Sequence, residues 1–236
     1  MNQLSKTEIK FSDNLKELYK IGGIMAIIIV ILIPIQMFIF IVWPPPDNVL
    51  DFFDLFNKNW LLGLLSLDLL YILNNILLIF VYLGLYSALR RVNQAYMLIA
   101  LILGLIGIAS YYASTVAFEM LSLSKQFSIA ENEELNMQLL TAGKIMLETY
   151  KGTAFDVYYV LNAITLLIIS KVMFQDKIFS KATAIWGLIS GVLMLIPTTA
   201  GILGLTFGIA SLIPWTVFSI LIAKRLFRLS NQKEVN

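Results

Sequence analysis

Six long apolar stretches constrain the fold of this chain more than any other feature. They lie at residues 22–43, 60–86, 96–118, 153–174, 182–200 and 202–223. A helix of about 20 apolar residues is what is needed to cross a hydrocarbon core of about 30 Å. Hydrophobic residues make up 59% of the chain, whereas about half is usual in a soluble protein. The sequence therefore predicts an all-α integral membrane bundle of six transmembrane helices, forming a single domain over residues 1–236.

Lysine and arginine residues alternate regularly across the connecting segments. Thirteen lie in the N-terminal segment, at residues 90–91, at residues 171–181 and in the C-terminal segment, and four lie in the remaining loops. Cytoplasmic loops carry the excess of positive charge, so this pattern predicts a plasma-membrane protein with both termini in the cytoplasm. The lipid bilayer is the expected partner, and the sequence leaves open a homo-oligomer or an unidentified membrane partner. A net charge of +2 is too small to indicate nucleic acid as a partner.

Two outer segments show helical patterns of their own. The first follows three prolines at 44–46 and predicts an interfacial helix in the headgroup region, or alternatively a lateral gate for a lipid-like ligand. The second, at 119–152, predicts an amphipathic outer segment over the mouth of the bundle, or alternatively a substrate lid; Ser128 and Glu131 match a capping box at its start. The apolar faces comprise Val49, Phe52, Phe53, Phe56 and Trp60 in the first segment and Leu135, Leu139, Ala142, Met146 and Tyr150 in the second.

Asp68 and Asp156 are the only acidic residues inside the six apolar stretches. A charge in lipid is costly, so an acid in a membrane span is a functional hypothesis by default. On a straight helix, Asp68 would lie about 12 Å and Asp156 about 5 Å from the outer ends of their spans. Asp156 then has a simple structural interpretation, because headgroup water or Lys151 lies within its reach.

The polar residues near these acids define a candidate ligand- or ion-binding site. Tyr71 and Asn75 share a helical face with Asp68 in the second span, and Asn162 follows Asp156 in the fourth. Three interpretations of Asp68 stay open: a hydrogen-bonded structural carboxyl, a cation or proton site of a transporter, and a catalytic acid or base. The candidate site therefore comprises Asp68, Tyr71, Asn75, Asp156 and Asn162.

The chain has neither histidine nor cysteine. Their absence excludes disulfides, imidazole and thiolate metal ligands, and catalytic sets that depend on histidine. There is also no glycine-rich phosphate-binding loop, so an ATP-driven role would need a separate subunit. We predict no metal, no cofactor and no catalytic residue.

Three short motifs resemble a known family. They are 67–71 (LDLLY), leading to 84–91 (GLYSALRR) in the second span, and 185–191 (IWGLISG), with a last span that closes on Arg225. Together they resemble an uncharacterised family of bacterial polytopic membrane proteins, the domain of unknown function 4386, over about residues 20–228. The resemblance implies a helical membrane bundle and no particular activity, and the acidic segment at 119–152 departs from the family's compact pattern.

These observations favour a non-enzymatic membrane protein, either a small permease or a structural or stress-related component. One alternative is a membrane-embedded enzyme that acts on lipid-like substrates, with Asp68 as acid or base. The other is the membrane subunit of an ATP-driven exporter, in which Arg90 and Arg91 would contact the ATPase.

Overall fold

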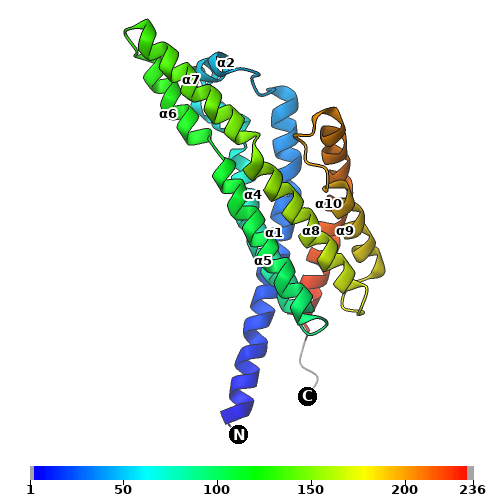
Figure 1. Ribbon diagram of the computed structural model, residues 1–236. Coiled ribbons are helices and arrows are strands. Elements are labelled where there is room, and N and C mark those ends of the chain that lie inside the picture. The colour runs from blue at the N-terminus through cyan, green and yellow to red at the C-terminus, as the bar shows by residue number, and fades with distance from the viewer. Residues whose placement is uncertain (1–2, 233–236) are drawn as a thin grey trace. The chain divides into compact units, whose positions relative to one another are not determined.

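The computed structural model describes residues 3–232, which are helical almost throughout (Figure 1). Ten helices follow one another in this range. They are α1 (Gln3–Val42), α2 (Val49–Lys58), α3 (Trp60–Ser66), α4 (Leu69–Leu89), α5 (Gln94–Ser114), α6 (Ala117–Ser128), α7 (Glu133–Tyr150), α8 (Thr153–Met173), α9 (Lys181–Leu193) and α10 (Gly201–Ser230).

Five helical segments are long and apolar enough to cross a membrane: Leu15–Val42, Leu69–Leu89, Gln94–Ser128, Glu133–Met173 and Gly201–Ser230. The apolar helix α9 has 13 residues, which is about 20 Å at 1.5 Å per residue. It is shorter than the span predicted at 182–200, because the chain turns before α10 and the Ala200 N–H donates to the Pro197 carbonyl at 3.0 Å. An all-α membrane bundle is confirmed, with a short fifth apolar helix.

The chain groups into two compact units. Unit 1 comprises Met1–Ile31, Ile76–Gly107 and Tyr159–Asn236, and unit 2 comprises Leu32–Asn75 and Ile108–Tyr158. The unit boundaries fall inside α1, α4, α5 and α8. That residues 1–236 form a single domain stays a prediction.

Unit 1 depends on small residues where its helices meet. Helices α9 and α10 pack side by side (Figure 1). A Cβ added to Gly187 of α9 would lie 2.4 Å from Ser170 Oγ of α8 and 2.8 Å from the Phe218 ring of α10. Glycine at this position therefore allows a close approach of three helices, as small residues do in membrane bundles.

Unit 2 is built around the aromatic face of α2. Phe53 is 1% exposed and its ring lies 5.3 Å from that of Phe127 on α6. This face does not contact lipid, because α2 packs on α3, α6 and α7 and turns its aromatic side chains into a protein core. Only Trp60, which begins α3, is exposed, at 57%. The buried members of this core are Val49, Phe52, Phe53, Phe56, Leu64, Leu67, Val116, Ala117 and Met120.

Helix α7 forms a hairpin with α6 (Figure 1). The predicted capping box is wrong: Ser128 ends α6, and Asn132 caps α7 by accepting a hydrogen bond from the Leu135 N–H at 2.8 Å. Gly143 is buried on the face of α7 toward α2, where an added Cβ would lie 2.5 Å from Val49 Cγ1. Helix α7 is therefore an amphipathic helix that packs on α2 and α6 through one face.

Candidate functional site

Asp68 lies in a break between two helices. The predicted continuous helix over 60–86 is interrupted because α3 ends at Ser66 and α4 begins at Leu69. Asp68 has φ 63°, and it is the one non-glycine residue with positive φ in the described part of the chain. Aspartate tolerates this left-handed conformation better than most residues, at some cost in energy. The depth of 12 Å expected from a straight helix therefore does not apply.

The carboxylate of Asp68 has a hydrogen-bond donor on another helix. The hydroxyl of Tyr150, the last residue of α7, donates to Asp68 Oδ2. Sequence reasoning placed Tyr150 on the apolar repeat of α7 and missed this contact. A phenol at the end of the outer helix, directly before the fourth apolar stretch, is the signal that could have suggested it.

Burial changes the acidity of Asp68, which immediately precedes the span beginning at Leu69. Its side chain is 9% exposed. Desolvation raises the pKa of Asp68 to about 6, and the hydrogen bond from Tyr150 opposes this increase. The carboxyl therefore changes charge in a mildly acidic range.

Five aromatic rings form a cluster next to this carboxyl. Tyr71, one turn after Asp68, lies 5.5 Å from Tyr111 and 6.3 Å from Tyr158 between ring centroids. The Tyr158 hydroxyl donates to the Tyr71 hydroxyl at 3.3 Å. Tyr111 has an electrostatic interaction with Asp68. The remaining members are Tyr112 and Phe155, whose ring centroids lie 6.0 Å and 6.5 Å from that of Tyr111.

Several buried oxygen atoms around the helix break have no hydrogen-bond partner among the described residues. They are Gln36 Oε1, Ser66 Oγ, Asn74 Oδ1, Asn75 Oδ1 and the Tyr111 hydroxyl. All five residues are 6% exposed or less. Native proteins leave few buried polar atoms unpaired, and each exception asks for an explanation such as a bound ion.

The other predicted site residues are divided between the two units. Asn75, in unit 2, donates from Nδ2 to the Tyr71 carbonyl at 3.0 Å. Asp156 lies in the first turn of α8, partly exposed, where an acid suits the helix dipole. Asn162 belongs to unit 1 and accepts a hydrogen bond from Tyr82. The structure thus brings together Asp68, Tyr71 and Asn75 around one stretch of α4.

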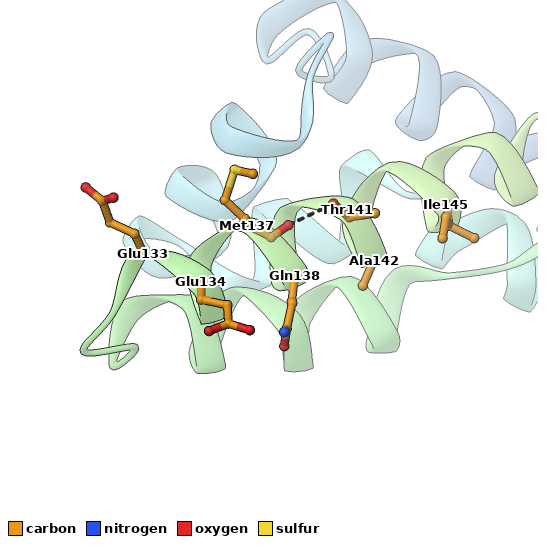
Figure 2. A pocket seen from close by; sticks show the side chains of 7 residues that line it. All are labelled: Glu133, Glu134, Met137, Gln138, Thr141, Ala142 and Ile145. Carbon is orange, nitrogen blue, oxygen red and sulfur yellow. Dashed lines mark hydrogen bonds between the residues drawn. The ribbon is translucent and has the colours of Figure 1, made fainter.

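A shallow groove of about 660 Å³ runs along α7 (Figure 2). All seven of its lining residues come from that single helix, and Thr141 donates to the Met137 carbonyl at 2.8 Å beneath it. Its polar members, including Glu133 and Glu134, are exposed. A groove lined by one helix has no convergent polar groups, so the helix break is the better candidate site.

The chemistry available at the helix break is limited. Within residues 3–232 no cluster of three or more acidic side chains could hold a metal ion. The site offers one carboxyl, neutral oxygens and phenols, and every lysine of unit 2 is exposed. Such a set can bind a proton or a small cation.

The apolar segments and the all-helical fold define the class: a polytopic helical membrane protein. The chain belongs to a family described as a domain of unknown function (DUF4386), which matches residues 20–227. Neither a curated protein nor a solved structure matches this chain.

Proposed function

We propose that this protein is a small, non-enzymatic permease of the plasma membrane, with both termini in the cytoplasm, in which Asp68 takes up and releases a proton during transport. The observation that carries the proposal is a buried carboxyl in a helix break that forms no ion pair with a lysine or arginine of the described residues. The orientation is inferred from the distribution of lysine and arginine, with thirteen residues in the segments on one side and four in those on the other. The side with the excess of positive charge is usually cytoplasmic.

The charge of Asp68 needs a counterpart from outside the protein. Burying an unpaired carboxylate costs several kcal/mol, and the four lysines of unit 2, at 58, 125, 144 and 151, are exposed. A proton removes that cost when it binds and restores it when it leaves. Acids in such positions mark proton and ion pathways in membrane proteins.

The helix break supports the same function. Transporters place their binding sites at discontinuous helices, whose irregular backbone is buried in protein or lines a polar cavity. Here Asp68 itself lies in the break, and the Tyr150 hydroxyl donates a hydrogen bond to its carboxylate. A purely structural acceptor for Tyr150 would not require an acid, because an asparagine oxygen accepts the same bond.

Proton entry into liposomes tests the proposal. The purified protein is reconstituted with a pH-sensitive dye in the lumen, and a permeant anion balances the charge. After the external pH is lowered, the lumen should acidify faster than in protein-free liposomes. Asp68→Asn should remove this difference, whereas Asp156→Asn, at the other acid of the apolar stretches, should keep it.

Unfolding temperatures of the variants separate function from folding. If Asp68→Asn reconstitutes and unfolds like the wild-type protein but no longer admits protons, the carboxyl is functional. Equal acidification with wild-type protein and with protein-free liposomes would reject the permease.

A further inference from the structure

We infer that a monovalent alkali cation binds at the helix break, held by the carboxylate of Asp68 together with the side-chain oxygens of Ser66 and Gln36. This inference rests on the proposed function in that it uses the same ion-binding carboxyl. It adds a second occupant, which competes with the proton for Asp68.

The unpartnered oxygens at the break can each coordinate a cation. Gln36 Oε1 can only accept hydrogen bonds or coordinate a cation, and it is buried with no partner among the described residues. Ser66 Oγ, 2% exposed at residue level, is in the same situation. One carboxylate oxygen of Asp68, Oδ2, accepts from Tyr150, so Oδ1 is available.

Hydrogen bonds place these side chains on one segment of backbone. Gln36 of α1 donates from Nε2 to the Leu65 carbonyl at 3.2 Å, which fixes its amide one residue before Ser66 and three before Asp68. The last carbonyls of α3 also belong to this segment, and the C-terminal end of a helix attracts positive charge. Carboxylate, amide and hydroxyl oxygens are the ligands that hard cations prefer.

The charge at the break selects a monovalent ion. Asp68 is the single buried acid of unit 2 among the described residues, whereas Ca²⁺ and Mg²⁺ sites made by protein use several oxygens with more negative charge. A proton on Asp68 would satisfy both other oxygens only through a chain in which Ser66 accepts from Asp68 and donates to Gln36. An alkali cation coordinates several oxygens at once and leaves the site neutral.

Thermal unfolding in detergent with different chloride salts tests the inference. At pH 8 and equal ionic strength, NaCl or KCl should raise the unfolding temperature above its value in choline chloride. At about 100 times the Kd the expected increase is about 5–10 °C. The comparison of NaCl with KCl identifies the preferred ion.

Three variants locate the cation. Asp68→Asn should abolish the increase, and Ser66→Ala should weaken the affinity by about tenfold, the loss of one coordinating oxygen. Glu148→Gln removes an exposed acid on α7 and should respond like the wild-type protein. If Ser66 has no ligand, Ser66→Ala only removes an unpaired hydroxyl, so the unfolding temperature should stay the same or rise in every salt.

The outcomes separate the inference from the proposed function. An identical unfolding temperature in NaCl, KCl and choline chloride overturns the inference, as does wild-type cation affinity in Ser66→Ala. If proton entry persists in liposomes in that case, the permease survives. A cation effect that depends on Asp68 and Ser66 without proton entry would keep the inference and reject the permease.

Discussion

The two units treat their buried polar groups differently. In unit 1, Tyr82 donates to Asn162, Thr165 donates to the Ala100 carbonyl at 3.1 Å, and Ser190 donates to the Ser211 carbonyl at 3.4 Å. In unit 2, the unpartnered oxygens are those of Gln36, Ser66, Asn74, Asn75 and Tyr111 described above, together with Asn136 Oδ1 on α7. Among the described residues of unit 1, the unpartnered atoms are Ser170 Oγ on α8 and Arg225 Nε on α10.

This contrast distinguishes polar residues with a structural role from candidates for ion binding. A hydrogen bond between two buried side chains in a membrane bundle is a sufficient reason for both residues. Asn162 has that reason and Asp68 has only part of it, since Tyr150 occupies one of its oxygens. Residue type alone does not distinguish the two cases.

The units also differ in how they pack, and the largest expected effect tests this difference. Phe53→Ala removes a ring that is 1% exposed in the core of unit 2 and should lower the free energy of unfolding by about 3–5 kcal/mol. Phe118→Ala, at a ring that is 59% exposed, should change it by less than about 0.5 kcal/mol. Denaturant unfolding in detergent measures both. Equal, small losses would mean that the face of α2 does not lie in a protein core.

The acid in the helix break should make stability depend on pH. Because the pKa of Asp68 is raised from 3.8 to about 6 in the folded protein, folding favours the protonated form. This stabilisation is complete below pH 3.8 and is lost as the pH rises through about 6, which amounts to about 3 kcal/mol.

Asp68→Asn provides the matched measurement. In choline chloride, without an alkali cation to bind Asp68, the free energy of unfolding at pH 4.5 and at pH 7.5 should differ less in this variant than in the wild-type protein. Asp156→Asn should keep the wild-type difference. A wild-type protein that is more stable at pH 7.5 would contradict the assignment, because it would require a lowered pKa.

A smaller effect concerns the contact between α7 and α2. In an exposed helix, Gly143→Ala would stabilise by about 1 kcal/mol. Here the added Cβ would lie 2.5 Å from Val49 Cγ1, so we expect a net loss of about 1–3 kcal/mol. Adding Val49→Ala to Gly143→Ala removes the clashing methyl group and should recover part of the loss. Stabilisation by Gly143→Ala alone would show that α7 does not pack tightly on α2.

Much of the fold follows from hydropathy, whereas the helix break does not. The stretch predicted at 153–174 agrees with α8 at Thr153–Met173, because about 20 apolar residues have few alternatives to a helix in lipid. The run around Asp68 is equally apolar, and no glycine or proline marks the interruption at Leu67 and Asp68. The break depends on the packing of α3 against α2 and α6, which local sequence does not contain.

The residues of the candidate site divide in the same way. Helical spacing groups Asp68 with Tyr71 and Asn75 because these positions are close along the chain, and their role as a site stays a prediction. Tyr150 lies 82 residues from Asp68 and Gln36 lies 29 residues from Leu65. Contacts of this kind depend on tertiary structure, so spacing within one span cannot reveal them.

The smallest expected effect concerns the coupling energy of a buried hydrogen bond in unit 1, between Tyr82 and Asn162. Tyr82→Phe and Asn162→Leu each remove one partner of a buried hydrogen bond, and each should destabilise by about 1–3 kcal/mol because the other partner loses this bond in a buried position. Their combined cost should be smaller than the sum by about 0.6–1.7 kcal/mol, the range measured for polar pairs in membrane helices. Denaturant unfolding of the two single variants and the double variant gives this coupling energy. Proton entry should be unchanged in all three variants, because a structural hydrogen bond between Tyr82 and Asn162 has no part in ion binding. Loss of proton entry in Tyr82→Phe would place the proton pathway in unit 1 and remove the distinction between the units.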